Sequence, residues 1–139
     1  KYKSGMQINY SAGANLYNSY LSGKKVYVAA NGNTASASEA LMGAMIDYGT
    51  VSYSDIFLTD TQGKGFARTY GKGIMQTSYS NPSTGEAVKL TSAQIFWPNG
   101  NSIHGKGVTT DDGAVAVSAT SYGEYPDAEL TEILNRITA

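Results

Sequence analysis

Hydrophobic and polar positions near the start of this 139-residue chain follow two different periods. The run over 24–30 is short and rich in strand-forming residues, which favours a buried strand ended by an Asn-Gly-Asn turn. From Ser36 or Ser38 to Tyr48 the apolar residues recur at spacings of three and four, which predicts a helix. Gly49 is suited to end that helix.

The pattern downstream of this helix is typical of strands and turns. We expect a polar, glycine-rich loop over 59–73, and turns at 81–85 and 98–101. The expected strands cover 51–58, 74–79, 87–90 and 93–97. Upstream of the first strand, residues 7–22 predict a short strand followed by a loop or a helical turn.

The last segment predicts a second, amphipathic helix over 128–137, with Asp127 as its cap. One face of this helix is apolar and consists of Leu130, Ile133, Leu134 and Ile137. The order of elements is strand, helix, several strands, helix. Because a single helix crosses between the early strands, the pattern predicts a mixed, strand-rich α/β domain rather than a doubly wound sheet.

Composition limits the classes of function. The chain is the size of one domain, and its 41% hydrophobic content can bury a core. A net charge of −1 provides no basic field, so we expect no nucleic-acid partner. The absence of cysteine excludes disulfides, a thiolate nucleophile and cysteine-based zinc sites. With one histidine in the chain, a serine activated by a lysine competes well with a serine–histidine site.

Ser36 is a candidate nucleophile at the start of the first helix. The amides at a helix N-terminus lack intrahelical partners and can stabilise an oxyanion, and the N–H of Ala37 is the natural donor. The small residues Ala35 and Ala37 would let a peptide carbonyl approach closely. The alternative is structural, because Thr34, Ser36 or Ser38 can be a simple N-cap with Glu39 completing a capping box.

Lys72 is a candidate general base. A lysine amine has an ordinary pKa of about 10.4, and burial favours its neutral form. The flanking glycines let the backbone bend tightly, and the side-chain carbonyl of Gln76, four residues on, could orient a neutral amine. The alternative is a solvated loop lysine, because Gly-Lys-Gly occurs again at 63–65 and 105–107.

These segments together resemble the C-terminal processing peptidases, also called tail-specific proteases. The matching segments occur in the family order: Asn33–Glu39, Ile46–Gly49, Tyr70–Gln76, Ala87–Ala93 and Pro98–Val108. The family usually has phenylalanine where this chain has Tyr70. The resemblance covers roughly residues 24–112.

The resemblance implies a serine endopeptidase of the Ser-Lys type that hydrolyses protein or peptide substrates, often near their C-termini. Ser36 would form the acyl-enzyme, Lys72 would be the general base, and Gln76 would hold the lysine as in some members. Ser38 falls on the neighbouring serine of the motif and is not assigned as nucleophile. No metal or nucleotide cofactor is implied.

The family also implies a fold and a location. We expect a spiral α/β core of the kind shared with crotonase-like and Clp protease folds. We also expect a site of action outside the cytoplasm, in the cell envelope, the periplasm or secreted. A membrane tether would lie outside this chain, and self-association into a homo-oligomer stays open.

Two departures from the family pattern qualify this expectation. The stretch between Asp47 and Lys72 is longer than in many members, with the extra length at 59–70, which makes Lys64 a rival base. The family's PDZ domain and upstream glycine-rich core segment are not in the sequence. We therefore expect 1–139 to be the C-terminal portion of a catalytic core, weak or inactive alone. The alternative function is a non-catalytic protein-binding or assembly module on the same scaffold.

Four other features have structural interpretations that we prefer. Asp47 matches an acidic helix-end position of the family, where a solvated carboxylate is expected. His104 is expected to be structural or exposed. The pair Asp111-Asp112 beside a glycine indicates a turn rather than a metal site. Trp97 is expected in the core.

Overall fold

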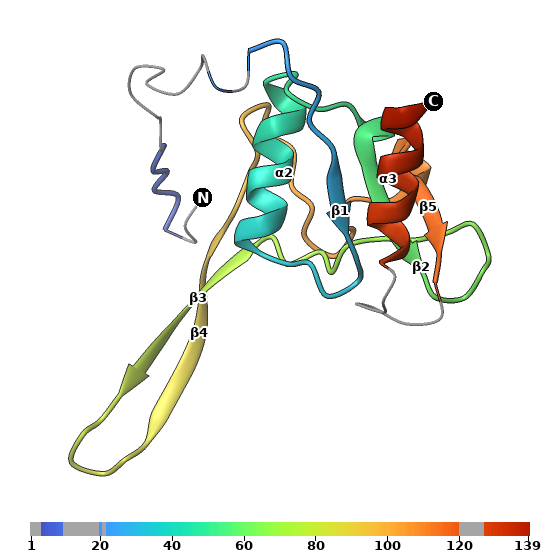
Figure 1. Ribbon diagram of the computed structural model, residues 1–139. Helices are drawn as coiled ribbons and strands as arrows, with labels where there is room; N and C mark the ends of the chain where they lie inside the picture. Colours follow the sequence, from blue (N-terminus) through green and yellow to red (C-terminus); the bar gives the residue numbers. More distant parts are fainter. Residues whose placement is uncertain (1–3, 10–19, 21, 120–126) are drawn as a thin grey trace.

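The computed structural model describes residues 4–9, 20, 22–119 and 127–139. The strand and loop expected over 7–22 fall largely outside this set. The described elements are, in chain order, β1 (Val28–Ala30), α2 (Ala37–Asp47), the 3₁₀ turn η1 (Tyr53–Asp55), β2 (Ile56–Asp60), β3 (Ile74–Ser80), β4 (Ala87–Gln94), the 3₁₀ turn η2 (Thr110–Asp112), β5 (Val115–Ser118) and α3 (Ala128–Thr138). The mixed α/β class expected from the sequence is confirmed (Figure 1).

The central sheet has three parallel strands in the order β1-β2-β5. Val28 pairs with Ile56, and Phe57 pairs with Val115. Every residue of β2 is buried, as expected for the middle strand of a parallel sheet. Strand β5 was not predicted, because four residues in a stretch rich in alanine and serine give little periodic signal.

The two faces of this sheet meet different helices. Ile56 and Leu58 point to one face and join the core cluster that contains Met42 of α2. Phe57 and Thr59 alternate to the other face, where α3 lies. There the guanidinium of Arg136 lies 5.0 Å from the centre of the Phe57 ring. The sheet is therefore the middle layer between α2 and α3 (Figure 1).

Helix α2 runs close to its prediction and ends as expected. Gly49 has a φ of +72° and donates its N–H to Ile46 O at 2.9 Å. On the buried side of the helix, a Cβ built on Gly43 would lie 2.0 Å from the ring of Trp97. The missing side chain lets the indole pack directly on the helix, so Trp97 is in the core as predicted.

Four strand predictions were wrong in their bounds. The strand expected over 24–30 begins only at Val28. The strand expected over 51–58 begins only at Ile56, because the Asp55 carboxylate accepts the N–H and hydroxyl of Ser52 and closes a 3₁₀ turn first. The segments 87–90 and 93–97 are not two strands but one, β4, which ends at Gln94. Strands β3 and β4 form an antiparallel hairpin that extends away from the sheet (Figure 1).

Helix α3 is confirmed, and Asp127 Oδ1 accepts the N–H of Leu130 at 2.7 Å as its cap. The apolar face of this helix is buried only in part. Only Ile133 of the four apolar residues is buried, whereas the remaining three, Leu130, Leu134 and Ile137, are half or more exposed. The side toward the sheet carries Glu129, Ile133 and Arg136 instead. No helix in the described part of the chain is long and apolar enough to cross a membrane.

Candidate active site

Ser36 lies directly before α2, at the end of the loop that leaves the carboxyl end of β1. The loop is a tight turn, in which Thr34 N–H donates to Asn31 O and Asn31 N–H donates to Thr34 Oγ1. Ser36 has φ 58° and ψ −113°. It is the one non-glycine residue with a positive φ among those described, and strain of this kind marks functional turns.

The first turn of α2 presents an amide without a partner. Ala40 N–H donates to Ser36 O and Ser38 N–H donates to Ala35 O. The N–H of Ala37 finds no acceptor among the described residues. That is the arrangement expected of an oxyanion donor, although it is also common to helix N-termini in general.

Glu39 is a fully buried carboxylate at the centre of the site. Its Oε1 accepts the hydroxyl of Thr69 at 2.6 Å and the N–H of Gly71 at 2.7 Å. Its Oε2 accepts the N–H of Ser36 and the N–H of Lys72, each at 2.9 Å. Four hydrogen bonds therefore satisfy a charge that would otherwise be very unfavourable to bury.

The shared oxygen of Glu39 brings the two candidate catalytic residues together. Ser36 and Lys72 are far apart in the sequence, yet their amide nitrogens are both within hydrogen-bond distance of one atom. Tyr70 N–H also donates to Thr34 O at 2.9 Å, so the two segments run side by side. The capping box predicted from the sequence is present in the Ser36–Glu39 bond, but its tie to Lys72 was not predicted.

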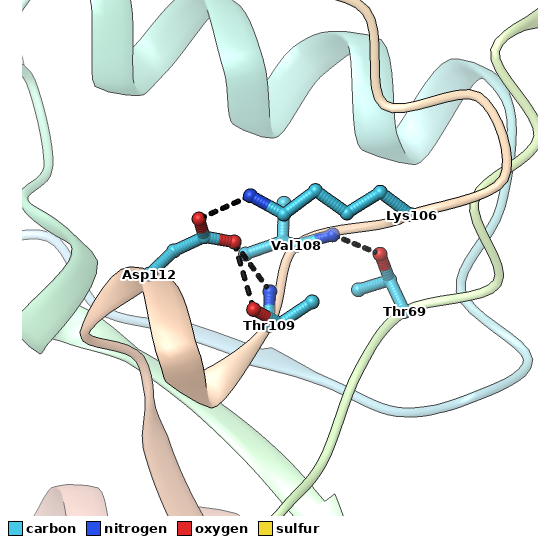
Figure 2. A network of polar contacts seen from close by, with 5 residues as sticks. All are labelled: Thr69, Lys106, Val108, Thr109 and Asp112. Carbon is cyan, nitrogen blue, oxygen red and sulfur yellow. Dashed lines mark hydrogen bonds and ion pairs between the residues drawn. The ribbon is translucent and has the colours of Figure 1, made fainter.

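A second network of polar contacts connects Thr69, in the segment that leads to Lys72, with residues 106–112 (Figure 2). The hydroxyl of Thr69 accepts the N–H of Val108 at 2.8 Å while it donates to the buried carboxylate. Next to Val108, the N–H and hydroxyl of Thr109 both donate to Asp112 Oδ2, and the amine of Lys106 pairs with Asp112 Oδ1. The segment 105–112 therefore fixes the backbone on which Lys72 stands.

Lys106 and Asp112 shift each other's pKa within this network. Burial by itself raises the pKa of Asp112, but hydrogen bonds from Lys106 and Thr109 outweigh it and hold that pKa below the ordinary value. The hydrogen bond to Asp112 raises the pKa of the Lys106 amine. Lys106 and Asp112 are thus both charged at neutral pH and serve as a structural ion pair.

Glycines allow the second and third Gly-Lys-Gly segments to touch. Gly105 N–H donates to Gly71 O at 2.9 Å. A Cβ on Gly71 would lie 2.9 Å from Gly107 N, and one on Gly73 would lie 2.9 Å from His104 N. The absence of side chains at Gly71 and Gly73 therefore lets these two backbone segments approach each other closely.

The two rival lysines differ in their surroundings. Lys72 is half-buried and its backbone is held by Glu39, whereas Lys64 is exposed in the loop after β2. Gln76 is exposed on β3, beyond a β-bulge at Met75. Among the described residues, no hydrogen bond joins the Lys72 amine to the Ser36 hydroxyl or to Gln76. The roles of Ser36, Lys72, Gln76 and Ala37 stay predictions.

The remaining candidates have structural partners. Asp47 is not simply solvated, because its Oδ2 accepts the N–H of Asn99 at 2.9 Å and so anchors the 98–101 turn. His104 is exposed, as expected. Asp111 and Asp112 lie in the turn η2, and no cluster of potential metal ligands occurs among the residues that the structure describes.

Comparison with known proteins identifies the family. The model of peptidase family S41 matches residues 1–113. A probable CtpA-like serine protease of Staphylococcus epidermidis is 36% identical over 98 residues, which cover 70% of this chain and 17% of that protein. A carboxy-terminal-processing protease of Bartonella bacilliformis is 36% identical over 88 residues, which cover 63% of this chain and 18% of that protein.

The chain spans less than a fifth of the length of these curated relatives. The family match nevertheless includes Ser36, Glu39, Lys72 and the supporting segment up to Asp112. The resemblance found in the sequence motifs is confirmed by this match. The chain belongs to peptidase family S41.

Proposed function

We propose that this chain carries the serine and lysine of a serine endopeptidase that hydrolyses protein or peptide substrates. The observation that supports this most is the Glu39 carboxylate oxygen shared by the amides of Ser36 and Lys72. A positioning residue of this kind sets the relative place of a nucleophile and a base without contacting substrate. The names of the relatives, which are serine and carboxy-terminal-processing proteases, support a substrate site near protein C-termini.

The mechanism that fits these residues is acyl transfer. The neutral amine of Lys72 takes the proton of the Ser36 hydroxyl while Oγ attacks the peptide carbonyl carbon. The N–H of Ala37 donates to the developing oxyanion. The lysine then gives the proton to the leaving amine, and an ester remains on Ser36. Water, deprotonated by the same lysine, hydrolyses the ester and frees the serine.

We propose that 1–139 is the C-terminal portion of a catalytic core, with a glycine-rich upstream segment supplying a second oxyanion donor. The chain spans 17% and 18% of the length of two of its relatives, which is consistent with its being one portion of a longer enzyme. A spiral core and an extracytoplasmic location belong to the same proposal.

Hydrolysis of an unstructured protein by the full-length enzyme tests this function. Ser36→Ala and Lys72→Ala should each lower kcat by at least roughly 10³-fold, because each removes a group that acts in the chemical step. Lys64→Ala is the matched control, since it removes a lysine between two glycines in an exposed loop, and it should retain activity. Full activity of Ser36→Ala would overturn the proposal, and a loss confined to Lys64→Ala would move the base into the loop.

A further inference from the structure

The segment that leads into Lys72 presents alternate side chains to opposite sides. Ala67 and Thr69 are buried, at 5% and 0% exposure, and face the core. Phe66 and Tyr70 are 47% and 59% exposed, and Arg68 between them is also exposed. Because side chains of an extended chain alternate, these three form one outward row, aromatic–cation–aromatic, at intervals of about 7 Å.

This row lines a depression beside the proposed active site. The depression has a volume of about 570 Å³ and lies at the carboxyl ends of the parallel strands β1 and β2, the edge at which the loop leading to Ser36 begins. Gly71, the residue before Lys72, and Gly32, in the loop that leads to Ser36, both line it. A polypeptide bound at Ser36 would therefore pass along the row.

The free charge of the depression is positive. Of the described residues that line it, Asp60 is the one acid and Arg68 the one cation. Asp60 is 2% exposed, and its two oxygens already accept the N–H groups of Gln62 and Gly65. The guanidinium of Arg68 donates Nε to Thr69 O and one Nη2 hydrogen to Tyr70 O, and no described residue accepts from Nη1. The exposed charge that a ligand meets is therefore the guanidinium.

We propose that this row is a substrate-binding surface for an extended peptide with an acidic residue flanked, two positions away on each side, by apolar residues. The carboxylate pairs with Arg68, and the apolar side chains contact Phe66 and Tyr70. The repeat of an extended peptide matches that of the row, because both are extended chains. This proposal rests on the proposed peptidase function, and it adds the chemistry of the preferred substrate.

Binding is measured with the full-length Ser36→Ala protein, so that no peptide is consumed. Three fluorescently labelled peptides differ only at the central position, which is Glu, Gln or Lys, with Leu two residues away on each side. Fluorescence anisotropy should give a dissociation constant about tenfold lower for the Glu peptide than for the Lys peptide at low salt. Equal dissociation constants for the three peptides would overturn the proposal.

Variants of the row test the assignment residue by residue. Arg68→Glu should reverse the order of the Glu and Lys peptides, and Arg68→Lys should keep it. Phe66→Ala should weaken all three peptides to a similar degree. The control Lys89→Glu makes the same charge change on the exposed β4 strand and should leave the order unchanged. If Arg68→Glu does not fold, Arg68→Gln should remove the preference, and a preference that survives Arg68→Gln contradicts the proposal.

Turnover of the same peptides separates the two proposals. Ser36-dependent hydrolysis without a charge preference would overturn the substrate surface and leave the peptidase function standing. A charge preference in binding, with no Ser36-dependent hydrolysis of any peptide, would support the surface as a peptide-binding site and overturn the peptidase function.

Discussion

Glu39 joins three parts of the chain through one side chain: the turn of Ser36, the segment of Thr69 and Gly71, and the backbone of Lys72. A carboxylate accepts at both oxygens, whereas an amide accepts at one and donates at the other. Replacing Glu39 with glutamine therefore tests the need for two acceptor oxygens while the size of the side chain stays the same.

Glu39→Gln should lower the free energy of unfolding by about 1–3 kcal/mol, because its amide nitrogen would face backbone N–H groups that lose their acceptor. Chemical denaturation of the chain measures this difference. Glu132→Gln is the control, since Glu132 is partly exposed on α3 and its ion pair among the described residues is with the neighbouring Arg136. An equal, small effect of both substitutions would contradict the role given to Glu39.

At the residue scale, the sequence predicted the candidate catalytic residues Ser36 and Lys72 but not that Glu39 would connect them. Ser36 and Lys72 stand in segments whose residue types fit their chemistry and their family. Glu39 was predicted only as part of a local cap, since a capping box spans four consecutive residues and needs no tertiary contact. That the same carboxylate also accepts the N–H of Lys72 depends on how two distant loops meet, which local patterns do not encode.

Among the elements, α2 depends on a residue that is poor for helices. Glycine in a helix interior is about 1 kcal/mol less favourable than alanine, yet Gly43 is where Trp97 packs. The indole Nε1 is buried and has no hydrogen-bond partner among the described residues, so shape rather than polarity holds the ring there.

Gly43→Ala should destabilise the protein, by about 1–3 kcal/mol, although it raises helix propensity. The reason is the 2.0 Å approach of its Cβ to the Trp97 ring. Thermal or chemical unfolding measures the change. The double variant Gly43→Ala/Trp97→Phe should recover part of the loss, because the smaller ring makes room. A stabilising Gly43→Ala would show that the helix and the indole are not in contact.

The elements with strong periodicity were predicted best. Helix α2 and strand β3 combine consistent spacing with clear turn residues at their ends, and both lie close to their predicted bounds. Strand β5 is short and weakly patterned, and it exists because β2 offers it an edge. The amphipathic pattern of α3 did not show which residues would be buried, since Glu129 accepts the hydroxyl of Thr59 and Ile133 is buried, whereas Leu130, Leu134 and Ile137 are exposed.

For the molecule as a whole, the stability of the fold depends on pH in two opposite ways. Glu129 has a raised pKa, whereas Asp55 and Asp112 have lowered pKa values. Burial, and then the nearby Asp127, raise the pKa of Glu129 above its ordinary value of 4.5. A raised pKa stabilises the fold fully below that ordinary value, and the contribution is lost as pH rises through the folded-state pKa. Asp55 and Asp112 have lowered pKa values, so their contribution is lost only as pH falls below about 3.8.

Glu129→Gln should therefore be more stable than the unmodified chain near pH 7, and the two should converge toward pH 4.5. The amide oxygen can still accept the hydroxyl of Thr59, so the bond to β2 is kept. Unfolding midpoints measured from pH 4 to pH 8 give the comparison. Glu132→Gln, on the same helix, should leave the pH dependence unchanged. A constant difference at all pH values would mean that Glu129 does not titrate differently on folding.

The central claim is that Ser36 is acylated during turnover. The most direct measurement mixes the full-length protein with a slowly hydrolysed ester or peptide, quenches in acid and locates the added acyl mass by peptide mapping. We predict the acyl group on Ser36, not on Ser38, and its absence in Lys72→Ala at the same time point. An acyl group on Ser38, or substrate turnover with acylation unchanged in Ser36→Ala, would contradict the account.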